Sequence, residues 1–255
     1  MKIVIVGAGV AGLGIGCRLV QAGAEVTILD RHEPARAATW AAAGMIGVTS
    51  ELGESGPDEI EFAKHSNDLW PAFAMELEAW TGRSIGYRRS GALMVAVTLE
   101  ALVQLGARIR SDPSLALLKA SETRALVPML TSEFAGALWA AEEAHVDSRA
   151  LGAALAQSFR RAGGTLLTGR TVTAIKIKSG RALAAMTGDD LHKADAILVA
   201  AGAWSGALAE GLPPVTPIKG EIVALAPPPG AALPAQVVWG NGVYLVPRKD
   251  RLLVG

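Results

Sequence analysis

The N-terminal stretch of the chain most restricts what it can fold into. Residues 2–31, KIVIVGAGVAGLGIGCRLVQAGAEVTILDR, place the glycine motif G-x-G-x-x-G between two short apolar runs. In this pattern Gly7 allows a sharp exit from the first strand, and Gly9 lets the backbone approach a pyrophosphate. Gly12 lets the following helix pack closely on the sheet. The order predicts a β-α-β unit that binds a dinucleotide.

The same stretch predicts which groups meet the nucleotide. The helix N-terminus offers N–H groups and a positive dipole end to the phosphates. Asp30, at the tip of the second strand, is placed to accept hydrogen bonds from ribose hydroxyls, which argues against a 2′-phosphate. Arg31 beside it keeps that question open. The motif by itself does not choose between FAD and NAD.

Composition limits the protein class and its partners. A length of 255 residues indicates one or two domains, and 24 basic residues balance 24 acidic ones, so the chain has no electrostatic footprint for nucleic acid. No apolar run is long enough to span a bilayer, and no signal-peptide pattern precedes the first strand. The single cysteine, Cys17, excludes an internal disulfide and is expected to be buried in the first helix. We expect a cytoplasmic protein.

Periodicity predicts the remaining elements. Apolar residues at Trp70, Phe73, Leu77 and Trp80 mark a helix face, which Pro71 is expected to kink or restart. The other predicted elements are a strand at 91–97, two helical stretches ending near 128, a helix capped by Asp147 and ended by Gly163-Gly164, strands at 165–168, 171–178 and 181–187, a buried strand within 194–205, and short β runs at 222–226, 237–247 and 251–255.

Five further segments occur in the order typical of FAD-dependent amino-acid oxidases: ATWAAAGMIG, VDSRALGAALAQSFRRAGG, ILVAAGAWS, VTPIKGEIVAL and GVYLVPRKDRLLVG. Through them the chain resembles this D-amino-acid oxidase-type (DAO) family, and specifically the glycine oxidase branch associated with thiamine biosynthesis. D-amino-acid dehydrogenases and sarcosine oxidases are close relatives. The resemblance covers essentially the whole chain. It implies noncovalent FAD and an α/β fold, in which a Rossmann-type FAD-binding domain accompanies an α+β substrate domain with a mixed sheet.

The resemblance also implies a domain division and a cofactor site. The discontinuous FAD-binding domain is expected at 1–86 and 145–217, and the substrate domain at 87–144 and 218–255. The implied cofactor-binding residues are Gly7, Ala8, Gly9, Val10, Ala11, Gly12, Asp30, Arg31, Thr39, Ala42, Ala43, Gly44, Met45, Val172, Ala201, Gly202 and Trp204. The small residues before Met45 let the backbone lie close to a flat ring. Val172 is included on resemblance alone.

Tyr244 is the candidate substrate-binding residue. In the glycine oxidase pattern a tyrosine followed by Leu-Val-Pro-Arg bonds the substrate carboxylate, and the segment from Tyr244 to Arg248 matches it. The alternative is a tyrosine that packs in a strand with its hydroxyl in water. Arg248 is expected to be structural, and all four histidines are expected at the surface. No residue is assigned as catalytic because the flavin accepts the hydride, and no His/Cys cluster has the spacing of a metal site.

The resemblance implies oxidation of glycine, sarcosine or a similar small amine by hydride transfer to flavin, with oxygen as acceptor and peroxide as product. It also implies a homo-oligomer for the full-length protein. The family continues beyond the equivalent of Gly255 and there carries the arginine that pairs with the substrate carboxylate. We therefore expect a C-terminally truncated chain that binds FAD weakly or not at all and is inactive alone.

Three alternatives stay open. A D-amino-acid dehydrogenase would pass its electrons to a membrane acceptor instead of oxygen. A noncatalytic half of a split flavoenzyme would need a second polypeptide to complete its site. An NAD-dependent dehydrogenase would leave ATWAAAGMIG and GVYLVPR unexplained.

Overall fold

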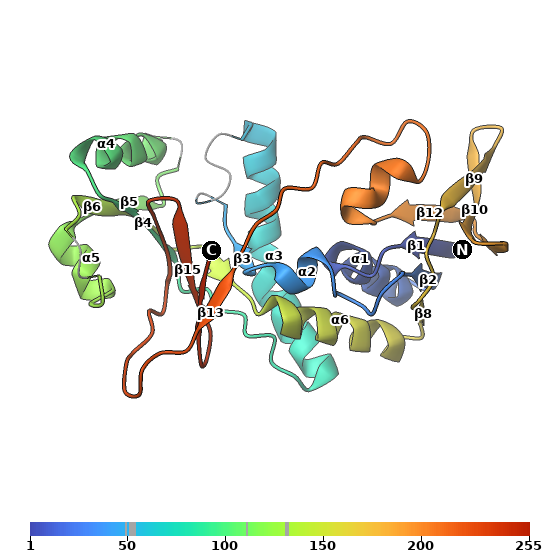
Figure 1. The fold of residues 1–255 in the computed structure, drawn as a ribbon, viewed down its shortest axis with the longest axis horizontal. Helices are drawn as coiled ribbons and strands as arrows, with labels where there is room; N and C mark the ends of the chain where they lie inside the picture. The colour runs from blue at the N-terminus through green and yellow to red at the C-terminus, as the bar shows by residue number, and fades with distance from the viewer. Residues whose placement is uncertain (49, 51–54, 111, 131–132) are drawn as a thin grey trace. The chain divides into compact units, whose positions relative to one another are not determined.

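The computed structural model describes residues 1–48, 50, 55–110, 112–130 and 133–255 (Figure 1). The chain divides into two compact units. Unit 1 comprises Met1–Ala42, Met75–Ile85 and Ser148–Lys219, and unit 2 comprises Ala43–Ala74, Gly86–Asp147 and Gly220–Gly255. Helix α3 (Pro57–Thr81) contributes residues to both. Residues 43–74, which were expected in the FAD-binding domain, belong to unit 2 in this division, and the expected domain boundaries stay a prediction.

A parallel four-stranded sheet with the order β12-β1-β2-β8 forms the centre of unit 1. Its elements are β1 (Lys2–Val6), α1 (Val10–Gln21), β2 (Glu25–Leu29), α2 (Ala38–Ala41), α6 (Ser148–Arg161), β8 (Thr165–Leu167), β12 (Ala196–Val199) and the 3-10 helix η2 (Gly202–Ala207). The predicted β-α-β unit is confirmed, since β1 and β2 pair in parallel from Lys2–Glu25 to Val6–Leu29.

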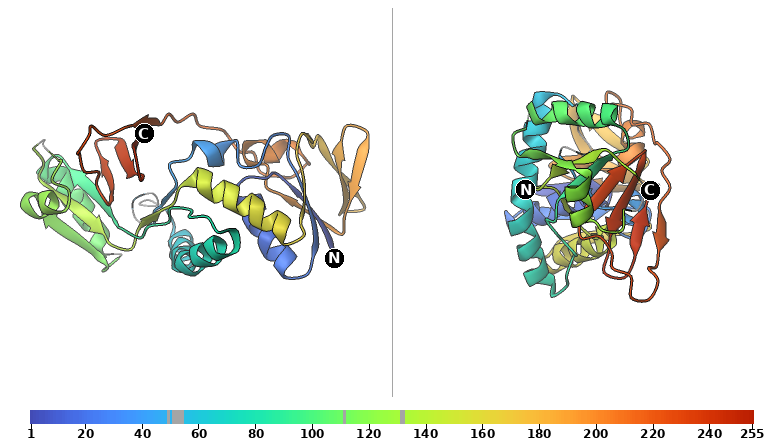
Figure 2. Two further views of the ribbon diagram at one scale, coloured as in Figure 1. Left: turned by 90° about the horizontal axis from the view of Figure 1, so that it is seen from below. Right: turned by 90° about the vertical axis from the view of Figure 1, so that its left-hand side faces the viewer.

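Different layers cover the two faces of this sheet. Helices α1 and α6 lie against each other, as Figure 2 (left) shows, and Gly16 of α1 fits between Ile28 and Phe159. On the other side, Val4 and Leu29 pack with Ala185 of a three-stranded antiparallel sheet. That sheet consists of β9 (Ala174–Lys178), β10 (Arg181–Thr187) and β11 (Asp190–Lys193), in the order β11-β10-β9.

A mixed seven-stranded sheet with the order β13-β16-β15-β14-β4-β6-β5 forms unit 2. Its strands are β4 (Ala92–Ala96), β5 (Leu115–Lys119), β6 (Gly136–Ala140), β13 (Val223–Leu225), β14 (Val237–Gly240), β15 (Val243–Pro247) and β16 (Leu252–Val254). Strands β4 and β14 pair in parallel and the other neighbours are antiparallel. The remaining elements are α4 (Leu99–Ala107), the 3-10 helix η1 (Arg108–Arg110), α5 (Ala120–Leu126) and the short pair β3 (Met45–Ile46) and β7 (Ala144–His145).

Several sequence-based expectations need correction. Helix α3 does not restart at Pro71, which lies inside a continuous helix. The strand expected to be buried within 194–205 is β12, whose side chains are exposed or half-buried because it is the outermost described strand of its sheet. Strands β5, β6 and β11 lie in segments for which no strand was expected. Cys17 is buried as expected.

Candidate cofactor site

The glycine loop follows β1 and is shaped by close backbone contacts. Gly7 has a φ of +108°, and a methyl group on it would overlap the Ala200 carbonyl. A methyl group on Gly12 would likewise overlap the Gly7 carbonyl oxygen. At Gly9, by contrast, a methyl group would meet only the Thr39 hydroxyl, at 3.5 Å. The loop is therefore tightly packed at two glycines and open at the third, where a pyrophosphate would approach.

The start of α1 provides donors for an anion. Its N-cap is Gly9, so no side chain caps the helix, and its first turn contains no acidic residue. The Val10 N–H donates to the Thr39 hydroxyl at 3.0 Å, and Thr39 is buried. The N–H groups of Ala11 and Gly12 are in the first turn, where a helix supplies no acceptor of its own. Their charge and direction suit a phosphate oxygen.

Asp30 links the tip of β2 to this loop. One carboxylate oxygen accepts the Ala8 N–H at 2.7 Å, and the other accepts the His32 N–H at 2.8 Å. A carboxylate has about four lone-pair positions, so both oxygens keep capacity for hydroxyl donors. This placement suits a ribose at the carboxyl end of the parallel strands.

The remaining predicted residues of unit 1 lie around the same end of the sheet. The Arg31 guanidinium lies 3.7 Å from the centre of the Trp204 ring in η2. Val172 and Ala201 pack against the cluster that contains Val6 and Leu29. Gly202 is exposed and begins η2. Ala42 is also exposed, and its carbonyl accepts a hydrogen bond from the Ser148 hydroxyl at 2.7 Å.

Unit 2 brings together the other predicted residues. Ala43 is buried with Ala92, Val237 and Val246, and both Met45 and Tyr244 pack against this cluster. The Tyr244 ring also lies 5.1 Å from the Trp239 ring, centre to centre, and directly against the backbone of Gly255. Tyr244 is half-buried, an environment compatible with either its substrate-binding or its packing interpretation. The segment from Ala43 to Met45 and the candidate substrate tyrosine therefore share one apolar cluster.

Arg248 and His145 form a buried polar group within unit 2. The guanidinium Nη1 donates to the Pro247 carbonyl and lies 3.1 Å from His145 Nδ1. Burial, followed by the charges of Arg248 and Arg88, lowers the pKa of His145 to about 4 from its ordinary value of 6.5. Burial also lowers the pKa of Arg248, against the opposing influence of Asp147.

The surface expectation was wrong for His145, which is only 2% exposed. It was wrong because β7 pairs with β3, so that His145 lies opposite Met45. The Arg248 guanidinium also lies against the ring, with Nη1 3.1 Å from His145 Nδ1. No local pattern marks this environment. His32 and His65 are exposed, and His192 is half-buried.

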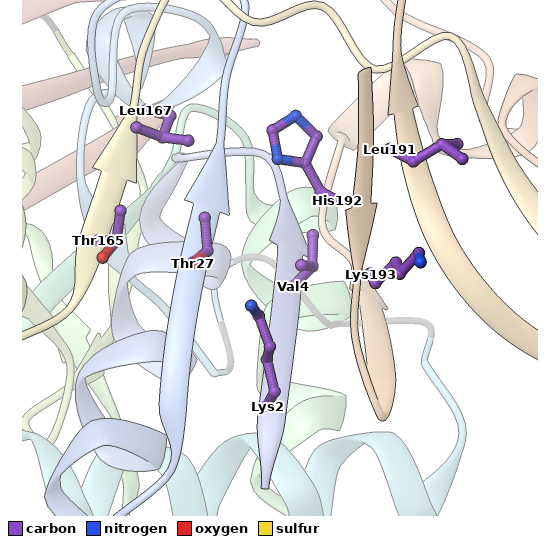
Figure 3. Close-up of a pocket in the computed structure, with 8 residues that line it drawn as sticks. All are labelled: Lys2, Val4, Thr27, Thr165, Leu167, Leu191, His192 and Lys193. Atoms are coloured by element: carbon purple, nitrogen blue, oxygen red, sulfur yellow. The ribbon is translucent and has the colours of Figure 1, made fainter. Parts of the chain in front are cut away.

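A pocket of about 370 Å³ lies elsewhere in unit 1, on the side of the sheet that faces the β9–β11 layer (Figure 3). The His192 ring projects from β11 toward β1 and β2. The lining residues are Lys2, Val4, Thr27, Thr165, Leu167, Leu191, His192 and Lys193. None of them belongs to the predicted cofactor set, so this pocket adds nothing to that site. In the described part of the chain, no group of three metal-type ligands occurs and no helix has the length and apolarity to cross a membrane.

This fold and site define a dinucleotide-binding α/β protein with a second, mixed-sheet unit. Residues 2–255 match the model of the DAO family, described as FAD dependent oxidoreductase. The chain belongs to this family of FAD-dependent enzymes.

Relatives of named activity support the assignment. The glycine oxidase of Geobacillus kaustophilus is 35% identical over 99% of this chain, which covers 69% of that protein, and its crystal structure matches with a TM-score of 0.91. The iminodiacetate oxidase of Chelativorans sp. BNC1 matches with a TM-score of 0.86 at 30% identity, over 99% of this chain and 70% of that one. The bifunctional protein ThiO/ThiG of Synechocystis sp. is 34% identical over 99% of this chain. The chain spans only 38% of that relative.

Proposed function

We propose that this chain binds FAD, with the ADP part of the cofactor on unit 1. The observation that carries the proposal is the opening at Gly9, beside the uncapped start of α1 and the Asp30 carboxylate. The Ala11 and Gly12 N–H groups would bind the pyrophosphate, and Asp30 would bind a ribose hydroxyl. The segment from Ala42 to Met45 would lie along the flavin.

The reaction proposed is oxidative deamination of glycine or a similar small amine. FAD supplies a two-electron acceptor when bound. The substrate would lose a hydride from carbon and a proton from nitrogen to give an imine, which water hydrolyses to a carbonyl compound and ammonia or an amine. Oxygen would take the two electrons and two protons to form hydrogen peroxide. The similarity to glycine oxidases supports this substrate class.

In this chain, Tyr244 is proposed to bind the substrate carboxylate through its hydroxyl. Its position against the Ala43 cluster, which Met45 also joins, supports this role. Arg248 is not proposed as the carboxylate partner, because its donors already meet backbone carbonyls and His145. Binding and orientation of the amine are therefore the contributions we assign to the protein.

Titration of the purified chain with ADP and with FAD tests the cofactor proposal, with Gly9→Ala and Gly14→Ala as a matched pair. A methyl group at Gly9 would enter the opening near Thr39, whereas a methyl group at Gly14 meets no atom within 4 Å. We expect Gly9→Ala to raise both dissociation constants at least about tenfold, because backbone approach to the pyrophosphate is lost. Gly14→Ala should leave them unchanged. Equal affinities for all three proteins would contradict the proposed site.

The reaction is tested by anaerobic mixing of the FAD-loaded chain with glycine, sarcosine or D-alanine, followed by oxygen and a peroxide assay. Bleaching of the flavin absorbance by glycine, with peroxide after aeration, is the outcome that the proposed reaction requires, and it would contradict the expectation from the resemblance that the chain is inactive alone. Tyr244→Phe should raise the substrate concentration required for half-maximal reduction of the flavin and leave FAD affinity unchanged. Bleaching without peroxide would favour another electron acceptor. A bound flavin that no amine reduces would contradict the proposed reaction for this chain.

A further inference from the structure

The Arg248 guanidinium joins three separate segments of unit 2. Nη1 donates to the carbonyl of Pro247 at 3.0 Å, and Nη2 donates to the carbonyls of Val146, at 2.9 Å, and Ala43. The side chain is 7% exposed, and Nε lies 4.0 Å from an Asp147 carboxylate oxygen. A buried charge with this set of acceptors is held in one position.

Besides the packing of Ala43 and Met45 in their apolar cluster, a short strand pair supports the segment that Arg248 meets at Ala43. Strand β3 contains two residues, and its pairing with β7 consists of Met45 opposite His145 and Ile46 opposite Ala144. So short a pair is too small to be stable alone. Gly44 lies at a φ of +76°, and its carbonyl accepts the Val146 N–H at 2.8 Å. A methyl group at Gly44 would overlap the Val146 carbonyl and lie 3.2 Å from Arg248 Nη2.

A planar fork is required for these contacts. Arginine directs several N–H groups in fixed directions in one plane, which lets it meet carbonyls from different segments together. Lysine offers a single ammonium on a flexible chain and cannot reproduce that arrangement. His145 completes the group by accepting from Nη1 on Nδ1, which requires the tautomer without a proton on that nitrogen.

We propose that Arg248 is a positioning residue: by binding the carbonyls of Ala43 and Val146 it fixes the backbone of residues 43–45 in the conformation that meets the flavin. The inference rests on the proposed function in one respect, the assignment of this segment to the flavin. The clamp itself can be measured without any cofactor.

Hydrogen exchange of the full 255-residue chain, read by mass spectrometry, measures the clamp. Arg248→Lys and Arg248→Met should speed exchange at residues 45, 46 and 146 about tenfold or more, because charge-assisted hydrogen bonds to the segment are lost. The β4 amides should keep their wild-type rates. Arg251→Lys is the matched control, since Arg251 pairs with Asp250 and Asp147 at the surface end of the same hairpin.

Ligand titration then tests the role toward flavin. Arg248→Lys should raise the dissociation constant for FAD several-fold and change the visible spectrum of the bound flavin, while the constant for ADP stays at the wild-type value. A wild-type chain that binds neither ligand would overturn the proposed function, whereas the exchange experiment would still decide the clamp.

Three outcomes would overturn the inference. Exchange at residues 45, 46 and 146 that is the same in wild type and both Arg248 variants would show that no clamp exists. Faster exchange throughout β4, β6 and β14 in Arg248→Lys would show that Arg248 maintains the whole unit rather than this segment. Equal losses of ADP and FAD affinity would likewise remove the specific link to flavin.

Discussion

Asp30 stabilises the glycine loop, and we propose that it also binds the nucleotide. Its two oxygens accept the N–H groups of Ala8 and His32, so the carboxylate holds the glycine loop against the tip of β2 before any ligand is present. Asp195 offers a comparison at the opposite end of the sheet, where it accepts the Lys2 N–H at 2.7 Å. Both carboxylates accept backbone N–H groups, but Asp30 lies at the proposed site whereas Asp195 lies at the far end of the strands.

We expect Asp30→Ala to lower the free energy of unfolding by about 2 kcal/mol and to raise the dissociation constant for ADP at least about tenfold. Asp195→Ala should also reduce stability but leave ADP affinity unchanged. Urea denaturation and calorimetric titration measure the two effects. If both variants change ADP affinity equally, Asp30 acts on binding through stability alone and its proposed ribose contact is absent.

His145 predicts a pH dependence of stability. Because its pKa is about 4 in the folded state and ordinarily 6.5, the unfolded chain binds the proton more tightly. The stabilisation is fully present above pH 6.5 and is lost as the pH falls toward 4, by at most about 3 kcal/mol. Urea denaturation of wild type and His145→Gln from pH 7.5 to 5 measures it. The glutamine variant should show a smaller loss, whereas His32→Gln, at an exposed position, should behave as wild type.

At the scale of elements, local sequence patterns predicted those helices and strands whose conformation is determined by residues close together in the chain. The β-α-β unit, β4 and α6 were predicted because their glycines and apolar residues lie close together in sequence. Strands β5 and β6 were not, because their pairing with each other and with β4 decides their conformation. Pro71 stays inside α3, where packing outweighs the local preference.

In the candidate site, too, some features follow from local sequence and others depend on contacts between distant residues. The loop glycines and Asp30 follow from one motif. The contacts of Arg248 with Ala43 and Val146, in contrast, join residues separated by 205 and 102 positions, so only the fold reveals them. The environment of His145 depends on those same contacts, which is why its burial could not be predicted.

Helix α1 allows a matched test of close packing on the sheet. A methyl group at Gly12 would overlap the Gly7 carbonyl, while one at Gly14 would lie in open space. We expect Gly12→Ala to lower the free energy of unfolding by about 3 kcal/mol because the helix must move away from the loop. Gly14→Ala should be neutral or stabilising by up to about 1 kcal/mol, since alanine favours helix. Thermal unfolding distinguishes them, and an equal increase in the stability of both variants would mean that helix propensity alone governs both positions.

At the scale of the whole chain, the two units have separate sheets and separate clusters of buried side chains. Every residue proposed for the ADP part belongs to unit 1, whereas Ala43, Met45, Tyr244 and Arg248 belong to unit 2. A ligand that binds only the folded form of a region stabilises that region against unfolding. ADP and FAD should therefore protect different sets of amides.

We expect ADP at one hundred times its dissociation constant to slow exchange in β1, β2 and α1 by up to about 100-fold, corresponding to about 2.7 kcal/mol. Amides of β4 and β6 should be unaffected. FAD should give the same protection and also slow exchange at residues 45 and 46. At the same ligand concentrations, Gly9→Ala should reduce the protection by both ligands at least about tenfold, and Gly14→Ala should retain it. Equal protection of β1 and β4 by ADP would mean that both units open in a single cooperative event, so that a ligand bound to unit 1 stabilises the entire chain.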